Sequence, residues 1–447
     1  MSIVAHPLLA ISPVDGRYRS RTEEVGHFFS EFALIRYRVF VEWAYLKWLI
    51  GLPLGKDLEK YQFQLPEPEQ RFQDFLLQDA IRVKEVELLT NHDVKAVEYL
   101  VKDHLSGLGL EELREWVHFG LTSQDINNVA IPLALKRFCQ KYLYPTLWDL
   151  ENRLEAKART WDEVVMLART HGQPASPTRL GKEIRVFSGR LKKQLQLLEQ
   201  IPFTAKFGGA TGNFNAHYAA FPHIDWHSRA NEFIESLGLE RSQPTTQIDH
   251  YDMLAAWCQG FTRILTILMD LCQDIWLYIS IDYFTQAVVE GEVGSSAMPH
   301  KVNPIDFENA EGNLGLARVL LEHMALKLPI SRWQRDLTDS TVLRNLGVPI
   351  AHAWVALQSI RRGLEKLSVN SQTIHDDLEK HPEVVAEAIQ TLMRREGILN
   401  AYEMLRDYTR GKVVTLQSLH DFVDTLPLSA QVKDEMKSWT PHNYVGR

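Results

Sequence analysis

The sequence predicts a mainly α-helical protein, and three observations support that fold class. Glycine and proline are scarce, at 24 and 19 of 447 residues, whereas ordinary proteins contain about 12% of the two together. No proline occurs between Pro244 and Pro299, and apolar residues from Leu254 to Ile275 recur there mostly at steps of three and four, which is typical of a helix. No run of alternating β-branched residues closes on an Asn-Gly or Asp-Gly turn.

The same helical spacing returns along the chain and predicts three helical domains. They are an N-terminal helical domain at 1–110, a central long-helix bundle at 111–365 and a C-terminal helical domain at 366–447. Pro382, with Glu383 in the first turn, marks the start of one short C-terminal helix. The helices expected outside 244–299 cover 133–144, 146–168, 178–200, 305–328, 350–368 and 383–395.

Composition and charge exclude several classes of protein. Hydrophobic residues make up 45% and charged residues 24% of the chain, which is typical of a globular protein and not of a disordered one. The net charge is −8 and no long run of Lys or Arg occurs, so a nucleic-acid surface is not expected. No apolar stretch reaches the roughly 18 residues of a membrane span, and the start of the chain lacks the basic region of a signal peptide.

The three cysteines have no C-x-x-C spacing and are odd in number, which argues against a disulfide framework or a zinc ribbon. They are Cys139, Cys258 and Cys272. A reducing compartment is the simplest interpretation, and we expect a cytoplasmic protein.

Residues outside the helical pattern are the candidates for chemistry, because catalytic groups favour loops on a rigid scaffold. The least ordinary loop, 290–304, holds two glycines, Ser295, Ser296 and Lys301 between two expected helices. It could act as a lid over a site, and a flexible linker is the alternative interpretation. The other candidate segments are 12–18, 90–99, 117–125 and 168–174.

His171 lies between an expected helix and Pro174, so we expect the helix to end there with the imidazole at its tip. Histidine titrates near neutrality and is a common general acid or base. The alternative is a packed or solvated histidine without a catalytic role, because the chain has 17 histidines and few of them can be catalytic. The same alternative applies to His92 and His118. Asn91 to Asp93 and Thr122-Ser123 could equally be helix caps.

Two patterns resemble known sites but lack required parts. His223 and His227 have a spacing that can bind metal on one helical face, but no glutamate of H-E-x-x-H and no third ligand accompanies them. The glycine-rich segment 208–213 has no following Lys and no expected preceding strand, so it is neither a P-loop nor a dinucleotide fingerprint. We expect a tight turn between helices at 208–213, and no metal site.

The segment 331–345 interleaves arginines with hydroxyl groups. Arginine grips phosphate or carboxylate through two parallel hydrogen bonds, so the segment could bind an anionic ligand. Ion pairs at i, i+4 on a helix surface are the alternative. The residues concerned are Arg332, Arg335, Thr338, Ser340, Thr341 and Arg344.

The segment GSSAMPHKVNP at 294–304 resembles the G-S-x-x-M-x-x-K-x-N signature of the fumarase/aspartase superfamily. Thr122-Ser123 with Asp125, and the segment 170–174, resemble the two other regions that this superfamily shares. Within the superfamily, the chain resembles the bacterial adenylosuccinate lyase family. The segments that carry this resemblance are SPVDGRY at 12–18, TNHDVKAVEY at 90–99, THGQP at 170–174, MPHKVNPIDFENAEGN at 298–313 and RWQRDLTDSTVLRN at 332–345.

The resemblance implies a fumarase/aspartase-like fold and a homotetramer whose active sites are shared between three subunits. It implies a carbon–nitrogen lyase of purine biosynthesis that releases fumarate by β-elimination. One substrate would be adenylosuccinate, giving AMP, and the other succinyl-aminoimidazole-carboxamide ribotide. Both are small phosphorylated purine-pathway compounds, and the resemblance implies no cofactor and no metal.

The resemblance also implies roles for individual residues. Ser295 would be the general base, His171 the general acid, and Lys301 with Asn303 would stabilise the developing negative charge, while Glu308 would orient His171. The charged groups of the substrate would be bound by Arg17, Tyr18, Arg335, Ser340, Thr341 and Arg344. The rest of the pocket would comprise Asn91, His92, Asp93, His118, Thr122, Ser123, Gln247, Ser296 and Asn309.

Two other hypotheses remain open from the sequence. Another superfamily member, such as an argininosuccinate lyase or a fumarase, would share Ser295, His171 and Lys301 but bind a different leaving group. A helical assembly or nucleotide-binding protein without activity could also have kept the fold, because a fold by itself does not establish function.

Overall fold

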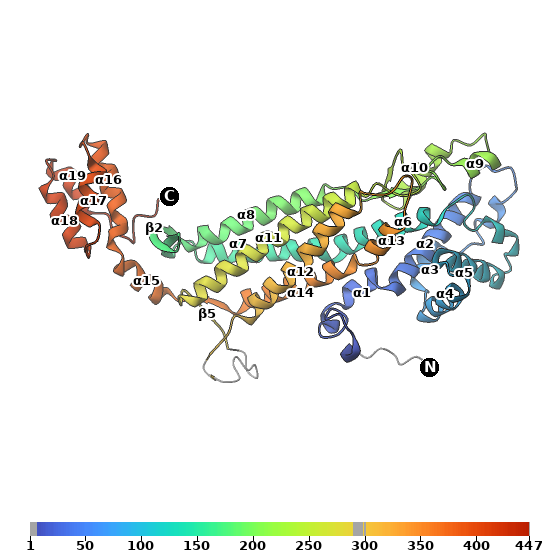
Figure 1. The fold of residues 1–447 in the computed structure, drawn as a ribbon, viewed down its shortest axis with the longest axis horizontal. Helices are drawn as coiled ribbons and strands as arrows, with labels where there is room; N and C mark the ends of the chain where they lie inside the picture. Colours follow the sequence, from blue (N-terminus) through green and yellow to red (C-terminus); the bar gives the residue numbers. More distant parts are fainter. Residues whose placement is uncertain (1–6, 289–297, 299–300, 447) are drawn as a thin grey trace. The chain divides into compact units, whose positions relative to one another are not determined.

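The computed structural model describes residues 7–288, 298 and 301–446 of the chain, and the described part is mainly helical (Figure 1). The helices of the first 160 residues are α1 (Glu23–Phe29), α2 (Glu31–Ile50), α3 (Pro68–Gln73), α4 (Leu77–Thr90), α5 (Asp93–Gly107), α6 (Ser123–Phe138) and α7 (Tyr144–Thr160). The middle helices are α8 (Leu180–Glu199), α9 (Asn215–Ala220), α10 (Trp226–Ser236), α11 (Asp252–Ser280) and α12 (Ile305–Lys327). The last helices are α13 (Thr338–Leu343), α14 (Gly347–Lys366), α15 (Ser371–Lys380), α16 (Ala386–Arg395), α17 (Ala401–Thr409), α18 (Leu416–Thr425) and α19 (Ala430–Lys437).

Three two-stranded sheets accompany the helices. The antiparallel pair β1 (Val165–Thr170) and β2 (Gln173–Arg179) forms a hairpin, β3 (Thr204–Lys206) pairs in parallel with β4 (Glu240–Ser242), and β5 (Phe284–Gln286) pairs with β6 (Leu367–Val369).

The hairpin corrects two expectations. The helix expected over 146–168 ends at Thr160, and Val165–Thr170 form a strand instead. The physical reason is local: two consecutive valines, Val164 and Val165, favour extended backbone, and the strand pairs with β2 through Met166↔Thr178 and its neighbours. His171 therefore lies in the turn of a hairpin and not at the tip of a helix.

The other expected helices are confirmed with small shifts at their ends. The predicted segments 178–200, 305–328 and 350–368 correspond to α8, α12 and α14. The segment 133–144 passes from α6 through a π-helical turn at Cys139–Leu143 into α7, so the helical path is continuous there. The glycine-rich segment 208–213 follows the short strand β3, and the expectation of a turn between two helices was wrong.

The chain divides into two compact units, each assembled from three separate segments. Unit one comprises Met1–Leu147, Lys193–Met269 and Asn309–Ser359, and unit two comprises Trp148–Lys192, Asp270–Glu308 and Ile360–Arg447. The boundary falls inside the five long helices α7, α8, α11, α12 and α14. The predicted three-domain division at 110 and 365 stays a prediction.

Within each unit, polar contacts join the segments of these long helices. In unit one the Trp257 Nε1 of α11 donates to the Tyr144 hydroxyl of α7 at 3.4 Å. In unit two the Ser188 hydroxyl of α8 donates to Glu151 of α7 at 2.9 Å. Apolar side chains fill the rest of the interface, since nearly every inward position of α11 is buried.

Helix α2 supplies much of the core of unit one. It is apolar on most sides, and Tyr37, Trp43 and Tyr45 are almost fully buried in a cluster with α5, α6 and α10. Two charged residues, Arg38 and Glu42, are buried within the same helix. Among the described helices, none combines the length and apolar character needed to cross a membrane.

Candidate active site

The candidate residues divide between the two units. In unit one, His92 begins α5 as its N-cap, and its Nδ1 accepts the backbone N–H of Lys95 at 3.1 Å. Its other ring nitrogen lies 3.4 Å from the hydroxyl of Ser123, at the start of α6. Asn91, which precedes it, ends α4 in the left-handed conformation at φ 51° and is exposed. The structure therefore brings together two predicted segments that are about 30 residues apart.

Asp93 is held between two arginines. Its Oδ2 accepts from Arg38 Nη2 at 2.8 Å and from Arg344 Nη2 at 2.7 Å. Arg344 also reaches Glu31 at 3.3 Å. Burial raises the pKa of Asp93, but the two guanidinium groups and the N–H of the next residue outweigh burial, and the pKa is lowered. Asp93 is therefore a carboxylate that positions Arg344.

The start of α6 is capped, as one of the two interpretations of Thr122-Ser123 allowed. Thr122 is the N-cap, and its backbone N–H donates to Asp125 Oδ2 at 2.8 Å in a capping-box arrangement. The same carboxylate accepts from Lys206 Nζ at 2.7 Å, and both charged side chains are fully buried. Thr122 and Ser123 are half-buried at the opening of this helix.

Gln247 and Arg335 form a second predicted pair. Arg335 Nη1 donates to Gln247 Oε1 at 3.0 Å, and Gln247 Nε2 donates to the carbonyl of Ala210 at 3.1 Å. The Ser340 hydroxyl, in α13, accepts from Gln124 Nε2 at 3.4 Å. Gln124 directly follows Ser123 in α6. The arginine-rich segment therefore contacts the start of α6 directly and is linked to the glycine-rich loop through Gln247.

These contacts define what we call the pocket wall: the starts of α5 and α6, Gln247, and Arg335 with Ser340 and Arg344. Thr341, on α13, is exposed. Arg332 is also exposed and pairs with Asp336 at 3.3 Å, so for this arginine the ion-pair interpretation holds.

His118 is paired with a buried carboxylate. It adopts φ 58°, and its Nδ1 lies 2.6 Å from Oε1 of Glu42, whose side chain is fully buried. Glu98 lies 3.8 Å from Nε2. Burial lowers the pKa of His118, but the charge and hydrogen bond of Glu42, with a smaller contribution from Glu98, outweigh burial and raise it.

His217, in contrast, is buried next to a phenol. Tyr45 donates its hydroxyl hydrogen to the carbonyl of Phe119 at 2.7 Å, so the His217 Nε2, 3.0 Å away, donates to the Tyr45 oxygen. Burial lowers the pKa of His217 to about 4, which makes the ring neutral at pH 7. The ring packs against Gly120, where an added Cβ would lie 2.7 Å from the imidazole.

Tyr18 lies against α12. Its hydroxyl accepts from Asn309 Nδ2 at 3.0 Å, and the Asn309 Oδ1 accepts from the Ser359 hydroxyl at 2.8 Å. Burial raises the pKa of Tyr18, but hydrogen bonds from Asn309 and the charge of Arg17 lower it overall. Arg17 itself is exposed. Predicted residues nearly 300 positions apart thus meet in unit one.

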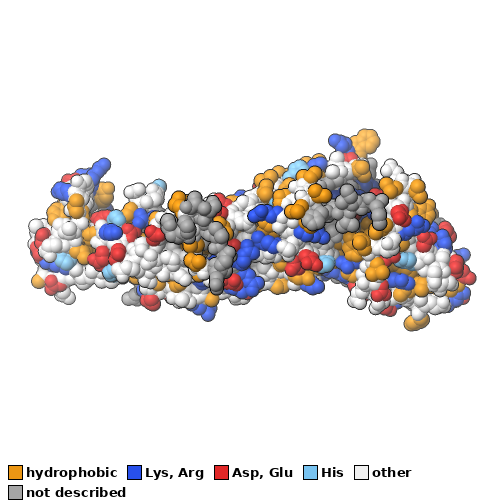
Figure 2. All heavy atoms as spheres, turned by 90° about the horizontal axis from the view of Figure 1, so that it is seen from below, with side chains coloured by type: hydrophobic (Ala, Val, Ile, Leu, Met, Phe, Trp, Pro, Cys, Tyr) orange, Lys and Arg blue, Asp and Glu red, His pale blue; other side chains and the backbone are white. Residues whose placement is uncertain are grey.

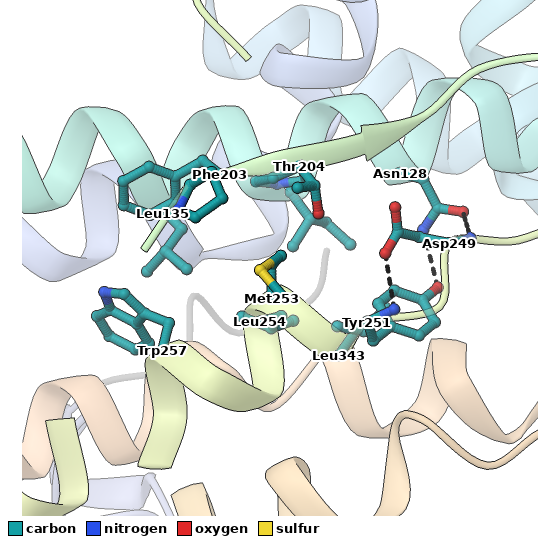
Figure 3. Close-up of a pocket in the computed structure, with 13 residues that line it drawn as sticks. Asn128, Leu135, Phe203, Thr204, Asp249, Tyr251, Met253, Leu254, Trp257 and Leu343 are labelled. Carbon is teal, nitrogen blue, oxygen red and sulfur yellow. Dashed lines mark hydrogen bonds between the residues drawn. The ribbon is translucent and has the colours of Figure 1, made fainter. Parts of the chain in front are cut away.

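A small cavity of about 30 Å³ lies behind α6 (Figure 3). Its polar side consists of Asn128, Asp249 and Tyr251, which hydrogen-bond to one another, while Leu135, Trp257 and other apolar residues line the remainder. A cavity of this volume has room for about two water molecules, so it cannot hold a nucleotide. The Tyr251 hydroxyl donates to Asp339 at 2.8 Å, which fixes α13 and Ser340.

The predicted acid–base residues belong to unit two. His171 is exposed in the turn between β1 and β2, with φ 54°, and Lys301 is exposed, whereas Asn303 is half-buried. Glu308 is exposed and accepts from Trp276 Nε1 at 3.1 Å. Ser295 and Ser296 lie outside the described residues.

Three side chains in the described part of unit two lie close enough to share a metal ion. They are His375, Glu379 and His442, with ligand atoms within 4.8 Å of one another. Glu379 and His442 already form a 2.6 Å contact, and the two imidazole rings stack at 4.8 Å. None of the three belongs to the predicted site, and the group does not include His223 or His227.

Sequence reasoning missed three charged residues that support the pocket wall: Arg38, Glu42 and Lys206. The sequence does carry a signal for the first two, because they lie at i, i+4 within the mostly apolar stretch 37–46 of α2, where a buried charge needs a partner. No comparable sign marks Lys206, whose partner Asp125 lies 81 positions earlier in the chain.

Comparison with known proteins gives matches over the whole chain. Residues 55–321 match the family described as Lyase, and residues 331–445 match the family described as Adenylosuccinate lyase C-terminal. The chain is 50% identical to the adenylosuccinate lyase of Dictyostelium discoideum, covering 100% of this chain and 98% of that protein. The adenylosuccinate lyase of Escherichia coli K12 is 44% identical, covering 98% and 97%.

Solved structures support the fold. A fumarate lyase from Mesorhizobium has a TM-score of 0.76 at 19% identity, covering 95% of each chain. The 3-carboxy-cis,cis-muconate lactonizing enzyme from Pseudomonas putida has a TM-score of 0.73 at 21% identity, covering 94% of this chain and 93% of that one. The predicted mainly α, fumarase/aspartase-like fold is confirmed.

Proposed function

Because the chain belongs to the adenylosuccinate lyase family, we propose that it cleaves adenylosuccinate into AMP and fumarate, and succinyl-aminoimidazole-carboxamide ribotide into the carboxamide ribotide and fumarate. The observation that carries this proposal is the full-length identity of up to 50% with proteins of that name. The chain is a lyase, and the reaction needs only proton transfer and stabilisation of charge, which side chains can supply.

The reaction removes a proton from the carbon next to a carboxylate and then breaks the bond to nitrogen. The electrons of the C–H bond form the new double bond of fumarate, and the departing nitrogen takes up a proton. A base, an acid and a nearby cation are therefore required. We assign the base to Ser295 and the acid to His171, with Lys301 and Asn303 stabilising the dianionic intermediate and Glu308 orienting the acid.

The pocket wall supplies groups for the phosphate and the carboxylates. Arg335 and Arg344 are the cations. Ser123 and Ser340 belong to the same wall and offer hydroxyl groups. Glu31 and Asp93 already pair with Arg344. An incoming phosphate must therefore be bound mainly through Arg335 or must displace the weaker 3.3 Å contact with Glu31.

His118 comes shortly before Thr122 in the chain, and the charge and hydrogen bond of Glu42 outweigh burial and raise its pKa. A histidine ring can hydrogen-bond a polar group of the substrate through either ring nitrogen. We assign His118 to substrate binding on this ground.

A homotetramer with shared sites fits the exposed apolar side chains of α12. Leu316, Val319 and Leu326 recur at helical spacing on this long helix and are 55%, 67% and 66% exposed in the single chain. Figure 2 shows further hydrophobic side chains among charged ones on one face of the molecule. Burying such a stripe in a helix bundle between subunits stabilises association.

A cytoplasmic location fits the cysteines. Cys139, Cys258 and Cys272 are all buried and form no disulfide. Burial raises the pKa of Cys139 and Cys258, which keeps these thiols protonated and unreactive.

The test is to offer adenylosuccinate, argininosuccinate, malate and aspartate separately to the purified protein and to follow fumarate. We expect fumarate from adenylosuccinate alone, and AMP in equal amount. Fumarate from argininosuccinate but not from adenylosuccinate would overturn the proposed function. Turnover of none of the four would support an inactive helical assembly.

A further inference from the structure

Asp125 and Lys206 form an ion pair in the interior of unit one. The two side chains have no exposed surface, and Lys206 Nζ lies 2.7 Å from Asp125 Oδ1. The ammonium group also donates to the carbonyl of Gly209 at 2.6 Å. Removing two charges from water is costly, and a well-packed apolar pair is often at least as stable. The arrangement therefore calls for an explanation other than stability.

The Asp125 carboxylate joins two separate backbone segments. At the start of α6 it accepts the N–H of Thr122 at 2.8 Å. From the glycine-rich loop after β3 it accepts the N–H groups of Gly208 at 2.9 Å and Gly209 at 3.1 Å. One carboxylate thus sets the distance between Thr122 and the loop.

Hydrogen bonds connect the glycine-rich loop to the pocket wall. Its next residue, Ala210, accepts from Gln247, which in turn accepts from Arg335 at 3.0 Å. Arg335 lies close enough for its charge to lower the pKa of Lys206, along with the larger effect of burial. Displacing the loop would therefore displace Gln247 and Arg335.

The loop has little freedom to compensate for such a displacement. Gly212 has φ 81°, and a Cβ there would lie 2.3 Å from the carbonyl of Thr245. A Cβ on Gly208 would lie 3.0 Å from the backbone of Gly212. The loop thus packs closely against itself and against the segment that precedes Gln247.

We infer that the Asp125–Lys206 ion pair is a positioning device for substrate binding: it fixes the spacing between Thr122 and Ser123 on one side and Gln247 and Arg335 on the other. Neither charge contacts substrate. The pair acts through backbone groups, and its effect on binding rests on the proposed function, since these four residues are the proposed contacts.

The test uses two variants: one removes both charges of the pair, and the other keeps them but moves the carboxylate. The double variant Asp125→Asn/Lys206→Met leaves no unpaired buried charge, and Asp125→Glu keeps the ion pair but moves the carboxylate by one methylene. For the folded double variant we expect KM for adenylosuccinate and the Kd for AMP, from calorimetry, to rise about tenfold, with kcat reduced less than about threefold. Asp125→Glu should raise KM about fivefold.

Lys47→Met is the matched control. It breaks a 2.6 Å ion pair with Glu67 in the same unit, and KM should not change. A folded double variant or a folded Asp125→Glu variant with KM within twofold of the unsubstituted protein would overturn the inference. Failure of both variants to fold would also overturn it, because the pair would then belong to the folding core.

Hydrogen exchange provides a readout that needs no substrate. The peptide containing Gly208 and Gly209 should exchange about tenfold faster in the double variant than in Lys47→Met. If the unsubstituted protein turns over no adenylosuccinate, the proposed function fails, while the exchange result still tests whether the ion pair holds the loop. Unchanged exchange in a folded double variant would contradict the inference directly.

Discussion

The pocket wall of unit one and the β1–β2 hairpin of unit two hold their polar residues in opposite ways. In the wall, Asp93 and Asp125 are each paired with a cationic side chain of low exposure, and His118, shortly before Thr122, is paired with the buried Glu42. In the hairpin, His171 is exposed in a turn at φ 54°. The charged groups of the wall are thus held by partners within the chain, whereas the His171 side chain is open to solvent.

Replacing His171 by Ala should produce the largest effect. Loss of a general acid typically costs 10²–10⁴-fold, so we expect kcat to fall about 10³-fold. The melting temperature should stay nearly unchanged, because the side chain is exposed. Steady-state fumarate release and a thermal melt measure both quantities.

The control for this variant is His223→Ala, which removes another exposed histidine and should leave kcat unchanged. Mixing the inactive His171→Ala and Ser295→Ala proteins should restore part of the activity if sites are shared between subunits. Near-normal turnover by His171→Ala would show that the acid is another residue.

Alanine substitutions at two glycines with positive φ test how tightly each region is packed. Gly120→Ala, just before the start of α6 at φ 71°, would place a Cβ 2.7 Å from the buried His217 ring, whereas Gly172→Ala, in the hairpin at φ 72°, meets no atom within 4 Å. We expect about 3 kcal/mol of destabilisation for Gly120→Ala, from strain and overpacking, and about 1 kcal/mol for Gly172→Ala, from strain alone. Urea unfolding measures the difference, and equal losses would contradict a rigid wall.

Arg335→Ala should affect binding more than chemistry. Loss of a charged hydrogen bond to the substrate costs about 2 kcal/mol, so kcat/KM for adenylosuccinate should fall about 30-fold, mostly through KM. Arg332→Ala is the matched control, since this exposed arginine of the same segment pairs with Asp336. A similar loss in both variants would mean that the segment's overall charge matters and not the position of Arg335.

The pH dependence of stability tests the buried histidine of unit one. The pKa of His217 is about 4 in the folded protein and about 6.5 when unfolded. Between these values the unfolded chain binds more protons, so stability falls by about 1.4 kcal/mol per unit as pH decreases. His217→Gln cannot titrate and still donates to Tyr45, so its unfolding free energy should depend less steeply on pH from 6.5 to 4. An unchanged slope would mean that other groups cause it.

Local patterns predicted the helices and the caps well. The spacing of apolar residues identified α8, α11, α12 and α14, because one buried face imposes that spacing on any helix. A helix cap was one of two interpretations of Thr122, and Thr122 does begin α6, with its backbone N–H donating to Asp125. The helix expected through 168 was wrong, because β-branched residues and pairing with β2 outweighed apolar spacing that short segments share with strands.

The sequence by itself determined the mainly α fold, the family and which segments carry the candidate site, because these depend on local spacing and short motifs. The tertiary structure decided which charges meet. Arg38, Asp93 and Arg344 converge from three distant helices or turns, and Asp125 finds Lys206 across 81 positions. Such pairs form because a charge that folding buries must find a partner in space. No local pattern specifies that partner.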